Sequence, residues 1–217
     1  MPAARPAPDV VSGFLTAVAP SKVQGAKVVS RTKVVAIVIA LLATGCSLVF
    51  PLTPLATAAR EGDLKEIDRL AAAGANLDER SGVNGWPPVL HAIHKGQAGA
   101  LGHLLEIGAS IAGSTGRQAL LMASGYGSAP MVRILLTHGV DPREDGGSGS
   151  RVLIEAVRGS GDIDYRWSGC QPHADVVRTL LTRDPGLRLG NADDARAART
   201  RAHERGCREL LQLLAAE

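Results

Sequence analysis

The fold of this 217-residue chain is decided by the stretch Thr53–Leu77, TPLATAAREGDLKEIDRLAAAGANL. Thr53 followed by Pro54 is a typical start of a short helix, because the threonine hydroxyl accepts a backbone hydrogen bond and proline fits the first helical position. Gly62 can adopt the left-handed conformation that ends such a helix, and Asp63 can cap the next one. The stretch therefore predicts a helix at 54–60, a tight turn and a second helix that ends before Gly74.

The same unit returns along the chain. Gly62 and Gly74 recur 34 positions later as Gly96 and Gly108, and the spacing of 12 residues recurs at Gly127 and Gly139. A unit of about 33 residues with fixed hinges is typical of a stacked repeat array. The sequence predicts an all-α solenoid of about five helix–turn–helix repeats with short hairpin tips. The expected repeats are 53–80, 81–113, 114–146, 147–190 with an insertion at 159–172, and a capping repeat at 191–217.

The pattern Thr53-Pro54-Leu55, Ala58-Ala59, Gly62, Gly74-Ala75-Asn76 resembles the ankyrin repeat family. The resemblance covers about residue 52 to the C-terminus. It implies a binding scaffold whose surface residues are interchangeable, so it indicates the fold more firmly than the function. It also implies that the protein is not an enzyme, needs no cofactor and acts as a monomer that binds another protein.

The N-terminal segment has a different character. Residues 1–30 are expected to be disordered or to precede the true start, and 31–45 read as an export signal in which a basic region precedes an apolar run. The residues Leu42 to Cys46 resemble a bacterial lipobox, which implies lipidation of Cys46 and a tether at 46–52. Two alternatives are an uncleaved anchor, since 34–50 contain no charge, and an ordinary cleaved signal. Each would place the repeats outside the cytoplasm, and Ser47 resembles the signal for the outer membrane of a Gram-negative host.

The charge of the chain is unevenly distributed. Residues 1–45 carry five basic and one acidic side chain, and the whole chain has a formal net charge of +3, which leaves −1 for 46–217. A nucleic-acid partner needs a concentrated basic surface. The Arg-rich run 195–203 is better explained as the polar face of a capping repeat, which no neighbour covers. No nucleic-acid partner is therefore expected.

Ankyrin arrays bind partners through hairpin tips and inner helices, and the repeat register places six of the ten predicted binding residues there. Trp86 is the strongest, because exposed tryptophan, tyrosine and arginine are enriched at interfaces; alternatively, its ring folds back over Pro87 and Pro88. The insertion adds aromatic and charged residues, and long loops on rigid scaffolds often carry binding. The predicted partner-binding residues are Asn84, Trp86, His94, Arg117, Tyr126, Arg158, Asp164, Tyr165, Arg166 and Trp167.

Two cysteines remain if Cys46 is lipidated. Outside the cytoplasm Cys170 and Cys207 are expected to pair, and the alternative is two buried or free thiols. No metal site is expected at His91 and His94, because no carboxylate or cysteine joins them at helical spacing. Asp162 and Asp164 are too few for a calcium site, and no pair of nucleophile and base stands out.

The expected function is protein binding on the periplasmic side of the cell envelope. Among exported proteins that look like this one, some are immunity proteins that neutralise a secreted toxin such as a phospholipase effector. The alternatives are a general envelope scaffold that supports a stress-response or surface assembly, and a host-directed interaction protein.

Overall fold

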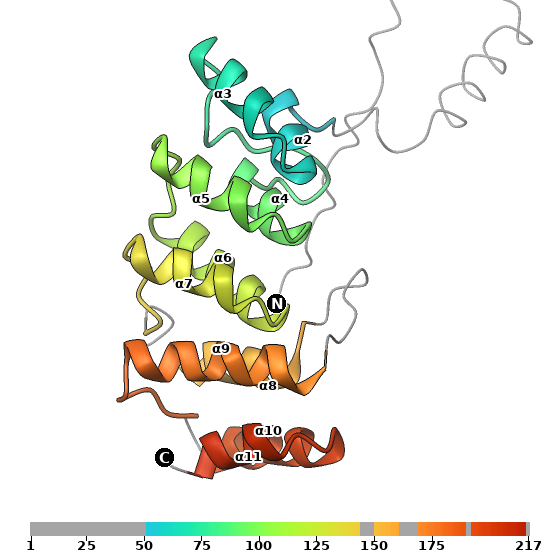
Figure 1. The fold of residues 1–217 in the computed structure, drawn as a ribbon, viewed down its shortest axis with the longest axis vertical. Helices are drawn as coiled ribbons and strands as arrows, with labels where there is room; N and C mark the ends of the chain where they lie inside the picture. Colours follow the sequence, from blue (N-terminus) through green and yellow to red (C-terminus); the bar gives the residue numbers. More distant parts are fainter. Residues whose placement is uncertain (1–50, 144–149, 161–168, 190–191, 216–217) are drawn as a thin grey trace, which may run out of the picture. The chain divides into compact units, whose positions relative to one another are not determined.

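The computed structural model describes residues 51–143, 150–160, 169–189 and 192–215. They form ten α-helices arranged as five antiparallel pairs (Figure 1). The pairs are α2 (Pro54–Glu61) with α3 (Leu64–Ala72), α4 (Pro88–His94) with α5 (Ala98–Glu106), α6 (Ser114–Gly125) with α7 (Ala129–Thr137), α8 (Ser150–Arg158) with α9 (Cys170–Arg183), and α10 (Ala192–Glu204) with α11 (Arg208–Ala215). The predicted all-α class and the repeated helical pairs are confirmed.

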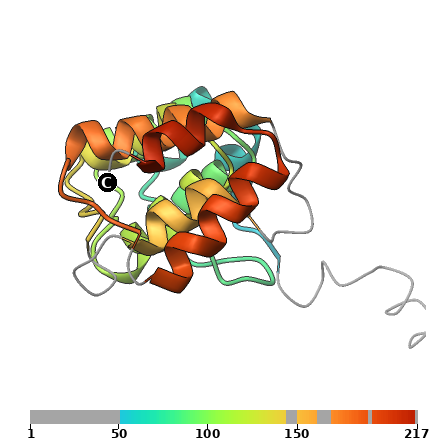
Figure 2. The same cartoon turned by 90° about the horizontal axis from the view of Figure 1, so that it is seen from below.

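The pairs stack so that like helices touch. The inner helices α2, α4, α6, α8 and α10 contact one another in chain order, and the outer helices α3, α5, α7, α9 and α11 do the same. Figure 2, seen along the stack, shows the two rows of helices side by side. Each repeat therefore packs mainly on its immediate neighbours, as in other repeat arrays.

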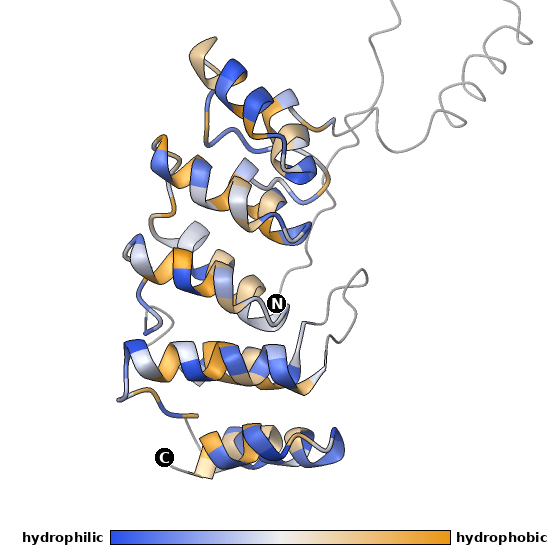
Figure 3. Ribbon diagram, viewed as in Figure 1, coloured by the Kyte–Doolittle hydropathy of each residue, from blue (hydrophilic) through white to orange (hydrophobic). Residues whose placement is uncertain are grey.

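Small residues let the inner helices approach closely. Ala58 and Ala59 in α2, Ala92 in α4, and Ala119 and Ala123 in α6 are buried. Larger aliphatic side chains fill the space between inner and outer rows, and Figure 3 shows hydrophobic positions interspersed with hydrophilic ones along the helices. The buried side chains form one continuous core along the stack, which holds the inner helices as a rigid row.

The capping predicted from the opening stretch is confirmed. The Thr53 hydroxyl accepts a hydrogen bond from the Ala56 amide at 3.2 Å, and the Asp63 carboxylate accepts one from the Glu66 amide at 3.0 Å. Gly62 has φ +74°, which a residue with a Cβ rarely adopts. The equivalent hinges have nearly the same angle, at Gly96, Gly127, Gly159 and Gly206.

The fourth repeat differs from the expected boundaries. The outer helix α9 begins at Cys170, whereas the sequence predicted the insertion to continue through 172 and the helix to begin at 174. Pro172 lies in the first turn of α9, where its missing N–H costs little. The last residues of the predicted insertion, 170–172, therefore belong to the outer helix.

Candidate functional site

Two contacts hold the base of the insertion to its neighbours. At one end, the Ser160 amide donates a 2.9 Å hydrogen bond to the Gly125 carbonyl of the third repeat. At the other end, Cys170 forms a disulfide with Cys207 of the capping repeat, with a Cα–Cα distance of 5.3 Å. The insertion thus leaves the stack at the end of the inner helices where Tyr126 caps α6.

Trp86 closes a short hairpin ahead of α4. Its backbone pairs with Ser81 in an antiparallel bridge, with N···O distances of 3.0 and 3.1 Å. The indole ring lies 5.7 Å from the His91 ring and 5.4 Å from the His94 ring, between centroids. Trp86 is therefore half-buried against the face of α4, with part of the ring still open to solvent.

His94 connects Trp86 to the next repeat. Its ring lies 6.3 Å from the Tyr126 ring, and His94 Nδ1 is 3.1 Å from the Tyr126 hydroxyl. Trp86, His94 and Tyr126, which we call the aromatic row, thus run across the second and third repeats. Three residues predicted independently from the repeat register lie in one contiguous cluster.

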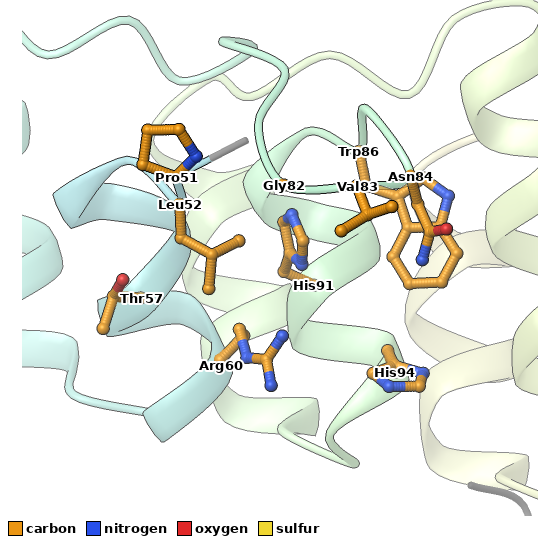
Figure 4. Close-up of a pocket in the computed structure, with 10 residues that line it drawn as sticks. All are labelled: Pro51, Leu52, Thr57, Arg60, Gly82, Val83, Asn84, Trp86, His91 and His94. Carbon is orange, nitrogen blue, oxygen red and sulfur yellow. The ribbon is translucent and has the colours of Figure 1, made fainter. Parts of the chain in front are cut away.

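An open groove of about 590 Å³ lies beside the aromatic row, between α2 and the hairpin 81–86 (Figure 4). Asn84 is exposed at the tip of that hairpin and lines the groove together with Trp86 and His94. The other lining residues are Pro51, Leu52, Thr57, Arg60, Gly82, Val83 and His91. Sequence reasoning missed Leu52, Val83 and His91 as groove residues; the one available signal was the position of Val83 beside Asn84 in the hairpin.

The remaining predicted residues lie elsewhere. Arg117 is in the first turn of α6 and so lies about 13 Å along the helix axis from Tyr126. Arg158 is exposed at the end of α8. It lines a second groove of about 610 Å³ against α10, with Asp193, Arg196, Ala197, Thr200, Arg201 and Glu204. These two arginines are not part of the aromatic row.

Some predicted residues fall outside the described part of the chain. These are the insertion residues Asp164, Tyr165, Arg166 and Trp167, the second acidic residue Asp162, and the lipidation candidate Cys46. Their roles stay predictions.

Two histidines are buried in the stack. His91 is 3% exposed, and its Nε2–H donates to the Ser81 carbonyl at 3.2 Å. His173 in α9 is fully buried, and its Nδ1–H donates to the Ala156 carbonyl at 2.6 Å. Burial lowers the pKa of both, and that of His173 falls to about 4. One signal in the sequence points to His173, which precedes buried Val177 and Leu180 at helical spacing.

Neither a metal cluster nor a membrane helix occurs in the part of the chain that the structure describes. No group of three or more His, Cys, Asp or Glu side chains there could hold a metal ion. Likewise, no helix among these residues combines the length and the apolar character needed to cross a bilayer.

No protein-family model matches the chain. A protein of Treponema pallidum (strain Nichols), described as ankyrin repeat-containing, is 32% identical over 90 residues. These residues make up 41% of this chain and 30% of the relative, so the chain spans less than a third of that protein's length. The match agrees with the repeat pattern of the sequence.

Two solved structures align over most of the stack. The human ASB11 ankyrin repeat domain has 21% identity and a TM-score of 0.45, covering 76% of this chain and 83% of that domain. An ankyrin repeat domain from Acinetobacter baumannii AYE has 22% identity and a TM-score of 0.40, covering 75% of this chain and 96% of that domain.

Proposed function

We propose that the helical stack binds another protein, and that the aromatic row of Trp86, His94 and Tyr126 is the centre of the contact. The observation that carries this proposal is the contact between the three rings, beside an open groove on the inner-helix side. Tryptophan and tyrosine are enriched among the residues that dominate binding energy at protein interfaces. The 90-residue match to an ankyrin repeat-containing protein supports a binding role of this general kind.

The rigidity of the stack favours such a role. The rings contact one another before a partner arrives, since the Trp86 ring packs against the His91 and His94 rings and Tyr126 contacts His94. A surface that is ordered in advance loses less conformational entropy on binding. A larger part of the free energy gained by burying the aromatic row therefore contributes to the affinity.

We further propose that the protein is exported and anchored to the envelope through a lipid on Cys46. The lipobox-like residues 42–46 support this assignment. The Cys170–Cys207 disulfide is a second support, because structural disulfides persist mainly in oxidising compartments. Radiolabelled palmitate should be incorporated into the wild-type protein and not into Cys46→Ser. Equal labelling of both proteins would contradict the assignment.

One specific form of this function is an immunity protein whose partner is a secreted toxin. This form predicts a toxin gene beside the gene of this protein, and protection of the cell that Trp86→Ala abolishes. A general envelope scaffold predicts neither. Neighbouring genes that lack any toxin across several genomes would favour the scaffold.

Affinity capture from envelope extracts tests the binding surface. The wild-type protein should retain a partner that Trp86→Ala loses. The control is Leu64→Ala, because Leu64 is 40% exposed on the outer helix α3 and lies away from the groove. Equal capture by wild type and Trp86→Ala would exclude the aromatic row as the centre of the contact.

A further inference from the structure

The groove beside the aromatic row has walls of different chemistry (Figure 4). Leu52 and Val83 supply aliphatic surface, and the Trp86 ring supplies a flat apolar wall. Val83 is 76% exposed and, together with Leu52 and Trp86, it presents apolar surface to the groove. An occupant of this groove would therefore bury apolar groups.

Positive charge lies at the floor of the same groove. Arg60, at the end of α2, points its guanidinium from that helix toward His91 and His94 (Figure 4). None of the described residues that line the groove is an aspartate or a glutamate. Within the described residues, no salt bridge joins Arg60 to a carboxylate. The guanidinium is thus available to an anion from outside the stack.

His91 contributes no charge to this floor. Burial is the main cause that lowers its pKa, and the nearby charges of Arg60 and His94 lower it further. The Ser81 carbonyl fixes its proton on Nε2, which leaves the buried Nδ1 without a donor. His91 is therefore an uncharged part of the groove lining, and the positive charge that a bound group would contact is that of Arg60.

We propose that this groove binds a carboxylate of the partner protein together with an adjoining apolar side chain. The Arg60 guanidinium donates hydrogen bonds to the carboxylate oxygens, and Leu52, Val83 and Trp86 cover the apolar group. Arg60 is the one permanently charged side chain among the described residues that line the groove, and a single guanidinium matches a singly charged carboxylate better than a doubly charged phosphate. The inference rests on the proposed protein-binding function and specifies the chemistry of one part of the partner.

Two sources could supply such a carboxylate, an acidic side chain or the C-terminus of a chain. Three N-acetylated pentapeptides separate them. The first has the sequence Ala-Leu-Glu-Leu-Ala with an amidated C-terminus. The second replaces Glu by Gln and keeps a free C-terminal carboxylate, and the third has Gln and an amidated C-terminus. The third is the neutral control, since it has the same apolar side chains and no carboxylate.

Binding is followed on the full chain labelled with 5-fluorotryptophan. The protein has two tryptophans, so ¹⁹F NMR gives two resonances, and the Trp86→Phe variant identifies that of Trp86. The Trp86 resonance should shift with one or both carboxylate peptides at a concentration at least about tenfold lower than with the neutral peptide. The Arg60→Gln variant should lose this preference, Arg60→Lys should keep part of it, and Arg133→Gln on the outer helix α7 should keep all of it.

Three results would overturn the inference: no peptide shifts the Trp86 resonance up to about 10 mM, the neutral peptide binds as well as the others, or Arg60→Gln changes nothing. Capture of the cellular partner tests the carboxylate assignment separately from the protein-binding surface. If Trp86→Ala loses the partner and Arg60→Gln keeps it, the carboxylate assignment fails and the protein-binding surface stands. If both variants keep the partner, the surface itself is wrong.

Discussion

Removing the disulfide between α9 and the capping repeat should weaken the C-terminal end of the stack. Cys170 and Cys207 are 37 residues apart in sequence, so the bond closes a long loop in the unfolded chain. The loss of loop-closure entropy for a loop of this length corresponds to about 4 kcal/mol of stability at 25 °C. Measured losses are usually somewhat smaller, so we expect the double variant Cys170→Ser/Cys207→Ser to lose about 2–4 kcal/mol.

The contacts around the bond indicate where the loss should appear. The Arg205 guanidinium donates to the Val157 carbonyl at 3.1 Å, and Arg178 pairs with Glu209, so α10 and α11 keep other links to the fourth repeat. Because each repeat packs only on its neighbours, the capping repeat should unfold first, as a separate event at lower urea concentration.

Urea unfolding followed by circular dichroism measures this loss, and hydrogen exchange locates it in α10 and α11. The wild-type protein treated with a reductant is the matched control, since it lacks the bond, keeps both cysteines and should show the same loss. A loss below about 1 kcal/mol would refute the magnitude. Two free thiols in the unreduced, purified protein would refute the pairing itself.

Two further predictions concern the stability of the fold. Gly62→Ala should lower the free energy of unfolding by about 1–2 kcal/mol, because its φ of +74° is unfavourable for alanine and the added Cβ would lie 2.5 Å from Gln97 Oε1. Gly99→Ala in α5, where nothing lies within 4 Å of the added Cβ, should instead raise it by about 0.5–1 kcal/mol. Equal changes for the two variants in urea unfolding would contradict this prediction. Acid should destabilise the stack through His173, whose folded pKa of about 4 lies below the usual 6.5. Between these values the unfolded chain binds a proton that the folded chain does not, so stability falls as pH falls, by about 3 kcal/mol in total. The variant His173→Asn should lack this fall in the free energy of unfolding between pH 6.5 and about 4. If the fall is unchanged in the variant, groups other than His173 cause it.

The repeat sequence was sufficient to predict the fold because its capping residues and hinge glycines all indicate the same helix–turn–helix unit. Thr53, Gly62 and Asp63 act through their own backbone neighbours, so their roles follow from the order of residues alone. The start of α9 was missed for the opposite reason. Pro172 is compatible with a loop or with a first helical turn, and only the packing of α9 in the stack decides between them.

The candidate site could be predicted in part. The register placed Trp86, His94 and Tyr126 near the same face, because Trp86 lies just before an inner helix, and His94 and Tyr126 lie at the ends of inner helices just before a hinge glycine. Their contact depends on side-chain rotamers, which the neighbouring repeat determines. The groove was not predictable, since Leu52 comes from the segment before the first repeat, Arg60 from the first repeat and Val83 from the hairpin of the second. Such a site exists only when two repeats are stacked.

The most direct test of the central claim is a crosslinking map of the bound partner. A photoreactive amino acid is placed in living cells at Asn84 on the hairpin tip, and separately at Lys65 and Arg133 on the outer helices, all of which are exposed. The account predicts a discrete adduct with another protein from position 84 and none from positions 65 and 133. Adducts from the outer-helix positions alone, or no adduct from position 84, would contradict it.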